Sequence, residues 1–197
     1  MAHIKKYIIL FFFVAGYNSY AQTKNDSVFK SALLYSFKLT DVITNKTVSP
    51  AQAQKKFIYI FLSPECPICQ NYTSVLNKLN QEYGRDIGFY GIVPGKTYSQ
   101  AEISNFAKKY KIGYTLLSDQ SLKFTRYLQA KVTPEVFFLN GNKLVYRGAI
   151  DNWFEGLGKA RANTTENYLK NAIMQDLKHA KVDVKRTKAI GCLINDF

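Results

Sequence analysis

The sequence predicts an α/β fold in which helices flank a central mixed β-sheet. Three observations lead to this prediction. An uninterrupted apolar run at 57–62 is bounded by polar residues, a segment at 67–83 carries apolar residues at helical spacing, and residues 135–149 form a hairpin pattern followed by another helical segment. Strand–helix–strand alternation favours parallel strands, and a closing hairpin adds antiparallel ones.

The first half of the chain supplies the first strands and the longest helix. Residues 34–40 alternate polar and apolar side chains, which predicts a strand followed by a turn at 41–46. The run FIYIFL at 57–62 is typical of a central strand buried on both faces. The helix at 67–83 has one apolar face, and Gly84 stands where a helix end is expected. The residues of this face are Tyr72, Val75, Leu76, Leu79 and Tyr83.

The second half continues the alternation and ends in a hairpin and a helix. Gly141 and Asn142 provide the expected turn of the hairpin. The predicted elements are a strand at 87–93, a helix at 99–110, a short strand at 114–117, a short helix at 121–129, strands at 135–140 and 143–149, and a last helix at 165–179.

The N-terminus has the pattern of a secretory signal. Two lysines precede the apolar segment YIILFFFVA, and Ser19 and Ala21 provide small residues for cleavage after residue 21. The apolar run is shorter than the ~20 residues that cross a bilayer, so no stable membrane span is expected after cleavage. We therefore predict a secreted or periplasmic protein. Its parts are a signal peptide at 1–21, a lead-in at 22–33, one domain at 34–179 and a basic tail at 180–197 that contains Cys192.

The composition excludes several classes of protein. The chain has 197 residues, 47% of them hydrophobic, with 27 Lys and Arg against 14 Asp and Glu, a net charge of +13. These values do not fit a disordered chain, a collagen or a protein with several membrane spans. The basic residues are scattered and do not alternate with aromatic ones, so no nucleic-acid partner is predicted. Three cysteines are enough for one redox pair with one thiol left over.

The most informative motif is Cys66-Pro-Ile-Cys69, at the junction of the buried strand and the amphipathic helix. Cys66 is expected at the helix N-terminus, where free N–H groups and the helix dipole stabilise a thiolate and lower its pKa. Pro67 suits the first helical position because its missing N–H costs nothing there. Cys69, one turn further on, is expected to be shielded and to act as the resolving thiol.

Two other interpretations of the cysteine pair stay open at this point. A zinc site needs a second pair of ligands, for which only His179 and Cys192 are available after signal cleavage. The pair can also form a purely structural disulfide. The position of the motif favours redox chemistry, which needs no organic cofactor.

Residues 132–135 (Val-Thr-Pro-Glu) directly precede a predicted strand and resemble the Thr-cis-Pro loop of the thioredoxin superfamily. Together with the cysteine motif, residues 34–150 resemble an exported thioredoxin-like domain of the alkyl-hydroperoxide-reductase/TlpA redoxin group (AhpC/TSA). The end of the chain is similar to a subgroup with a Gly-Cys-x-Ile tail. The resemblance implies a thioredoxin-like fold and a loop at Thr133 and Pro134 that faces the cysteines and binds a partner strand.

On this basis we predict an extracytoplasmic thiol–disulfide oxidoreductase. Cys66 attacks a partner disulfide and Cys69 resolves the mixed disulfide. The partners are protein thiols or disulfides and a thiol electron donor or acceptor. Glu65 replaces the tryptophan common before the first cysteine and should oppose thiolate formation. Pro67 and Glu135 are further candidate modulators.

Two alternatives remain. A thiol peroxidase of the AhpC/TSA type would carry Pro-x-x-x-Thr/Ser-x-x-Cys. Ser63 fits this pattern but Tyr59 stands at the proline position, and Arg126 and Arg147 are only candidates for the peroxidase arginine. A Cu(I)-binding thioredoxin-like chaperone would use Cys66, Cys69 and Cys192 as soft ligands. Cys192 itself is either a small buried residue, a third metal ligand, or a partner for a disulfide with Cys66 or Cys69.

Overall fold

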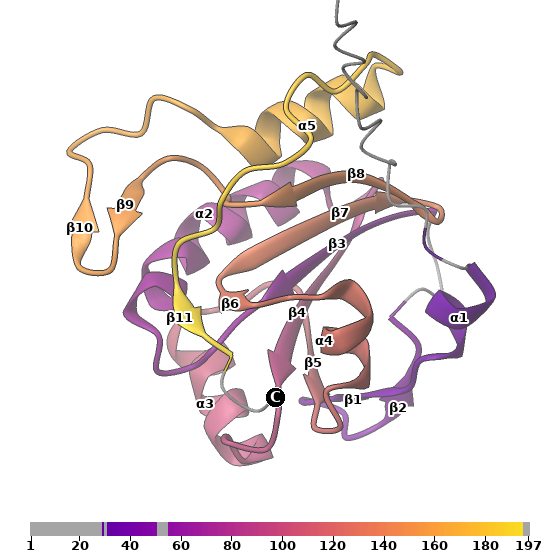
Figure 1. Ribbon diagram of the computed structural model, residues 1–197. Helices are drawn as coiled ribbons and strands as arrows, with labels where there is room; N and C mark the ends of the chain where they lie inside the picture. The colour runs from indigo at the N-terminus through magenta and orange to yellow at the C-terminus, as the bar shows by residue number, and fades with distance from the viewer. Residues whose placement is uncertain (1–28, 30, 51–54, 195–197) are drawn as a thin grey trace, which may run out of the picture.

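The computed structural model describes residues 29, 31–50 and 55–194, so the predicted signal peptide at 1–21 lies outside the described residues. The central sheet has seven strands in the order β2-β1-β5-β4-β3-β7-β8 (Figure 1). Its strands are β1 (Leu39–Asp41), β2 (Thr47–Val48), β3 (Lys56–Phe61), β4 (Gly88–Pro94), β5 (Thr115–Asp119), β7 (Glu135–Asn140) and β8 (Lys143–Gly148).

The sheet is mixed, as predicted. β3, β4 and β5 are parallel, whereas β7 pairs antiparallel with β3, and β8 with β7. β1 joins the other side antiparallel to β5. The strand β3 is central, and its residues from Phe57 to Phe61 are fully buried because helices cover both faces of the sheet.

In the part of the chain that the structure describes, five helices form the two outer layers. Side chains of α2, α3 and α5 pack into a core on one face of the sheet, whereas α1 and α4 contribute to a second core on the other face (Figure 1). The helices are α1 (Ser31–Ser36), α2 (Pro67–Tyr83), α3 (Gln100–Lys109), α4 (Lys123–Leu128) and α5 (Tyr168–Leu177). None of the helices in the described part of the chain is long and apolar enough to cross a membrane.

One predicted element is wrong. The strand expected at 34–40 is instead the helix α1 followed by the short strand β1. Leu34 is fully buried in the second core, and Ser36 donates a hydrogen bond from its hydroxyl to the Leu33 carbonyl at 2.8 Å. This segment is too short for its residue pattern to distinguish a strand from a helix. The helical conformation fits the burial of the Leu34 side chain.

Among the described residues, four short strands that the sequence did not predict lie outside the central sheet. β9 and β10 form a small hairpin before α5. β11, near the C-terminus, pairs antiparallel with β6, which directly precedes β7 (Figure 1). These strands are β6 (Val132–Thr133), β9 (Phe154–Gly156), β10 (Lys159–Ala160) and β11 (Cys192–Leu193).

Candidate active site

Cys66 lies at the N-terminus of α2, as the motif predicts. It is the N-cap residue, with extended φ and ψ of −73° and 114°, and Pro67 follows inside the first turn. The Cys66 N–H donates to the Ser63 carbonyl at 3.2 Å, which fixes the turn between β3 and the helix. The Cys66 side chain makes no capping hydrogen bond in this state, but its N-cap position lies at the positive end of the helix dipole, which stabilises negative charge.

Cys69 lies one turn further along α2 and is completely buried. The Ser63 N–H donates to its Sγ at 3.4 Å. Burial raises the pKa of the Cys69 thiol to about 12, although hydrogen bonds with the Ser63 backbone and the Thr133 side chain act in the opposite direction. Cys69 is therefore a protonated thiol at neutral pH, shielded from solvent as predicted.

The loop before β7 faces the two cysteines. The Thr133–Pro134 peptide bond is cis, which confirms the expectation from the Thr-Pro motif. The Thr133 carbonyl oxygen lies 3.2 Å from Cys66 Sγ. Thr133 is buried, and its side chain also interacts with Cys69, so this one residue contacts both sulfurs of the motif.

The disulfide of the structure joins Cys66 to Cys192 and leaves Cys69 free. Their Cα atoms are 6.1 Å apart across a sequence separation of 126 residues. In this state the chain does not contain the expected Cys66–Cys69 bond, because β11 places Cys192 directly opposite Thr133. Of the alternatives left open for Cys192, the structure shows the disulfide with Cys66.

The three candidate modulators have different surroundings. Glu65 and Pro67 are exposed on either side of Cys66. Glu135 is buried, but its carboxylate is bound by the Arg147 Nε at 2.8 Å and by the Lys131 N–H at 3.0 Å. The Glu135 carboxylate thus forms an ion pair with Arg147, and its role as a modulator of the sulfurs stays a prediction.

Of the residues compared with the peroxidase pattern, Ser63 lies beside the cysteines, whereas Tyr59, Arg126 and Arg147 lie toward the other face of the sheet. Tyr59 belongs to the core on the other face of the sheet from Cys66 and Cys69, and its hydroxyl donates to the Pro50 carbonyl at 3.1 Å. Arg126 lies on α4, which packs on that same opposite face. The Arg147 guanidinium stacks 4.6 Å from the centre of the Phe137 ring, in that opposite core too.

Within the described residues, no group of three or more His, Cys, Asp and Glu side chains is arranged to hold a metal ion. Cys66 and Cys192 are joined to each other, so two of the three sulfurs named for a Cu(I) site are not thiolates in this state. His179, the histidine named for a zinc site, is exposed after the end of α5.

A small pocket of about 110 Å³ lies beside the disulfide. The Ser63 hydroxyl and the Tyr98 hydroxyl are 2.9 Å apart at its wall, and Thr133, Leu193 and Ile194 also line it. Sequence reasoning missed Tyr98 and Ile194, because nothing in their local sequence indicates that they meet Ser63. The sequence feature that pointed to this pocket was Ser63, because it stands at the Thr/Ser position of the Thr/Ser-x-x-Cys pattern before Cys66.

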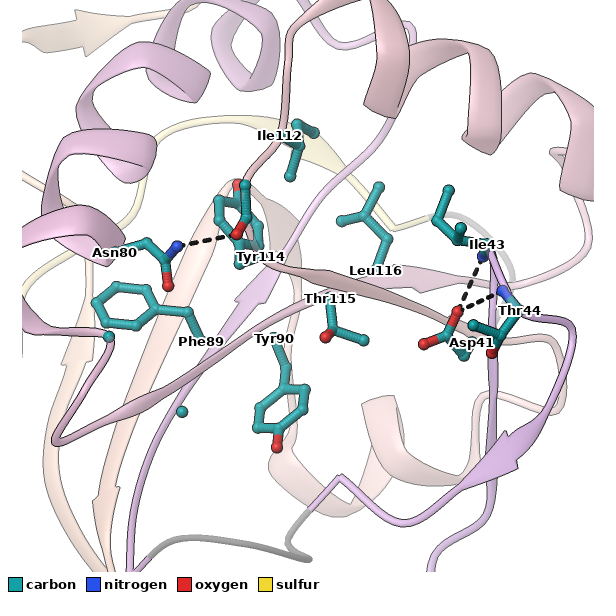
Figure 2. A pocket seen from close by; sticks show the side chains of 13 residues that line it. Asp41, Ile43, Thr44, Asn80, Phe89, Tyr90, Ile112, Tyr114, Thr115 and Leu116 are labelled. Carbon is teal, nitrogen blue, oxygen red and sulfur yellow. Dashed lines mark hydrogen bonds between the residues drawn. The ribbon is translucent and has the colours of Figure 1, made fainter.

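A larger cavity, about 510 Å³, lies elsewhere, where β1 and β5 meet the loop before β5 (Figure 2). Two of its polar side chains have partners within the chain. Asp41 Oδ1 accepts from the Ile43 and Thr44 N–H groups, and the Asn80 side-chain amide donates to the Gly113 carbonyl at 3.0 Å. The buried Tyr114 hydroxyl, which also lines the cavity, has no hydrogen-bond partner. A tyrosine hydroxyl is not a thiol redox group, so the cysteines remain the candidate site.

Residues 32–147 match the AhpC/TSA family. The chain belongs to the AhpC/TSA family. The matching segment contains Cys66, Cys69, Thr133 and Pro134 and ends before the tail that carries Cys192. The chain is thus a thioredoxin-like redoxin by family, whereas the Gly-Cys-x-Ile tail subgroup stays a prediction.

Solved structures agree with this fold. A hypothetical protein from Sinorhizobium meliloti is 23% identical with a TM-score of 0.72, over 80% of this chain and 89% of its own. An uncharacterized conserved protein from Geobacillus kaustophilus is 22% identical with a TM-score of 0.71, over 80% and 87%. A secreted Mycobacterium tuberculosis disulfide oxidoreductase homologous to Escherichia coli DsbE is 20% identical with a TM-score of 0.50, over 56% and 81%. No curated protein sequence matches the chain.

Proposed function

We propose that the protein is an exported thiol–disulfide oxidoreductase that exchanges disulfides with protein partners through Cys66 and Cys69. One observation carries the proposal. Cys66 caps α2 against the carbonyl of the cis-Thr133-Pro134 loop, and a buried free thiol, Cys69, follows one turn later. Export rests on the signal pattern at 1–21.

The reaction has two exchange steps. The Cys66 thiolate attacks one sulfur of a partner disulfide, forming a mixed disulfide and releasing the other partner sulfur as a thiolate that takes up a proton. Cys69, after losing its proton, then attacks Cys66 Sγ, which forms the Cys66–Cys69 bond and releases the reduced partner. Run in reverse, the same steps oxidise a partner dithiol.

Each residue of the site supports one of these steps. The first turn of α2 stabilises the thiolate of Cys66, both as nucleophile and as leaving group. The Ser63 N–H and the Thr133 side chain interact with Cys69 and lower the cost of deprotonating it. A general base is not needed for the first step if Cys66 is ionised at working pH.

The structure favours this function over a peroxidase. The residue at the proline position of the peroxidase pattern, Tyr59, and both candidate arginines belong to the opposite face of the sheet. Neither of these two arginines therefore lies on the face of the sheet that holds Cys66, where it could stabilise the oxygen that leaves a peroxide.

Thiol–disulfide exchange with glutathione, quenched with acid at set times, tests the proposal in both directions. The reduced mature protein is mixed with oxidised glutathione, and the oxidised protein with reduced glutathione, and acid-quenched samples are resolved by mass. In the Cys192→Ser background, which removes the third thiol, we expect Cys66→Ser to abolish exchange and Cys69→Ser to accumulate a glutathione adduct on Cys66. The faster direction distinguishes a reductase from an oxidase.

A third reaction, reduced protein with hydrogen peroxide, tests the alternative. If peroxide oxidises Cys66 at least 100-fold faster than oxidised glutathione does, the peroxidase replaces our proposal. Exchange that persists in Cys66→Ser would likewise overturn the role of Cys66.

A further inference from the structure

The end of the chain lies where a partner strand would lie. β11 pairs antiparallel with β6, with Cys192 opposite Thr133 and Leu193 opposite Val132 (Figure 1). The Ile194 N–H extends the ladder by donating to the Lys131 carbonyl at 3.0 Å. This extended segment is bonded through its cysteine to Cys66, which is the geometry of a mixed disulfide with an outside protein.

We propose that β11 is a built-in partner strand and that Cys192 is a third redox-active cysteine, which occupies Cys66 until Cys69 displaces it. We further propose that the external partner is a protein cysteine in an extended segment with the same pattern, glycine before the cysteine and an aliphatic residue two positions after it. This inference rests on the proposed thiol–disulfide exchange and names its partner class.

Close backbone contact explains the glycine. A side-chain Cβ on Gly191 would overlap the Thr133 carbonyl oxygen and carbon, and would lie 3.0 Å from the Pro134 nitrogen. These atoms belong to the backbone of a buried loop and cannot move aside as a flexible side chain would. Only glycine before the cysteine therefore allows the strand to approach the loop in this register.

The side chains of the strand differ in the way a recognition segment requires. Ile194 is buried in the core that faces α4, whereas Leu193 is 71% exposed. Cys192 and Ile190 pack against the core that contains Cys66. Strand pairing thus provides register, and the positions of Cys192 and Ile194 provide selectivity.

The segment before β11 fixes the tail on β8. The Arg147 N–H donates to the Lys185 carbonyl and the Thr187 N–H donates to the Arg147 carbonyl, both at 3.0 Å. The Thr187 hydroxyl accepts from the Ala149 N–H at 2.9 Å, and Gly148 leaves room for it. The tail is therefore anchored five residues before Cys192 and can release the strand without leaving the domain.

Release is an internal exchange that needs no added oxidant. The deprotonated Cys69 attacks Cys66 Sγ, the Cys66–Cys69 bond forms, the Cys66–Cys192 bond breaks, and Cys192 leaves as a thiolate that takes up a proton from solvent. The number of disulfides is unchanged. The product has a free strand site beside β6 and a thiol on a mobile end.

Mapping the disulfides of the oxidised mature protein tests the first part. Samples are alkylated with N-ethylmaleimide, quenched with acid at set times and digested for mass analysis. In the wild type we expect slow labelling of Cys192, the thiol that exchange exposes, and in oxidised Cys69→Ser we expect none. Gly191→Ala should shift the population to Cys66–Cys69 with rapid labelling of Cys192, whereas the matched control Leu193→Ala should behave as the wild type.

Two results would overturn this part. One is an unchanged ratio of the two disulfides in Gly191→Ala. The other is labelling of Cys192 in Cys69→Ser at the wild-type rate, which would mean that Cys69 does not displace it. Circular dichroism of each variant shows whether it is folded before the labelling is interpreted.

Two synthetic peptides test the partner class. They carry the sequence Ala-Ile-Gly-Cys-Leu-Ile-Asn or the same sequence with alanine for glycine, each as a mixed disulfide with 2-nitro-5-thiobenzoate, whose release is followed at 412 nm. With reduced Cys192→Ser protein, we expect the glycine peptide to react at least tenfold faster. Equal rates would overturn the assigned pattern.

The mixed disulfide of glutathione with the same chromophore separates the two proposals. If Cys66 fails to react even with this small disulfide, the proposed exchange function fails. If it reacts normally but the two peptides are indistinguishable and Gly191→Ala has no effect, the built-in partner strand alone fails.

Discussion

Reduction of the disulfide between Cys66 and Cys192 should lower the thermal stability of the protein by a large amount. The cleanest material is the Cys69→Ser variant, which can form only this one disulfide. The bond closes a loop across a sequence separation of 126 residues. In the chain-entropy description, a crosslink of this span restricts the unfolded chain by about 5 kcal/mol.

This free energy converts to a measurable shift. In a domain of this size, each kcal/mol moves the melting temperature by about 2–4 °C, so reduction should lower Tm by about 10–20 °C. The assay is differential scanning calorimetry of Cys69→Ser with and without a phosphine reductant. The Cys69→Ser/Cys192→Ser double variant is the control, because the reductant should leave its Tm unchanged.

The comparison uses one sequence in two redox states, so any cost of serine at the buried position 69 cancels. A difference below about 2 °C between oxidised and reduced Cys69→Ser would refute the reasoning. It would mean either that the tail is not bonded to Cys66 in solution or that the unfolded chain is already restricted without the bond.

Three further outcomes follow from individual contacts. The pKa of the Cys69 thiol is about 12, so the rate of exchange between the two disulfides should rise about tenfold per pH unit from pH 7 to pH 10. Quench-flow with mass analysis measures this rate, and a flat pH profile would contradict the thiolate of Cys69 as the attacking group. The Tyr72 hydroxyl donates to the buried Asp151 carboxylate at 2.5 Å. Tyr72→Phe should therefore lower the free energy of unfolding in urea by about 2 kcal/mol, and an unchanged unfolding midpoint would argue against the hydrogen bond. Arg147→Met leaves the buried Glu135 carboxylate without its cation and should lower the free energy of unfolding by about 3 kcal/mol. Adding Glu135→Gln to the same chain should restore most of this stability. If it restores none, the loss comes from packing and not from charge.

Most of the fold could be predicted because its elements have strong local patterns. The apolar run at 57–62 became β3, and the apolar face between Tyr72 and Tyr83 became part of α2 with the predicted bounds. The hairpin of β7 and β8 followed from its glycine-asparagine turn. Elements of two or three residues could not be predicted, since strands such as β6 and β11 exist only through the pairing they make across the fold.

Strong local patterns also made the first two cysteines and the Thr133-Pro134 loop of the candidate site predictable, but not the partner of the third cysteine. The motif that contains Cys66 and Cys69 is local, and so is the Thr133-Pro134 pair, so each carries its own signal. The position of Cys192 depends on a contact between segments 126 residues apart, and no local pattern encodes which of two sulfurs it meets. The requirement for glycine at position 191 becomes evident only when the fold brings the Thr133 carbonyl beside it.

The weakness of the strand pairing explains why a covalent bond is needed to hold the tail. β11 contributes two residues to the ladder, of which Leu193 is largely exposed, and beyond them Ile194 adds one hydrogen bond and one buried side chain, so the non-covalent contact is short. The anchor at Thr187 nevertheless keeps the free tail near Cys66 at an effective concentration on the order of 1 mM, as expected for a short flexible link. An outside cysteine at micromolar concentration would lose this competition by about a thousandfold if the two strands bound equally well. A partner protein must therefore bind more of the surface around the strand site than the tail does, and the exposed side of the pocket at Ser63 and Tyr98 is the described surface next to it.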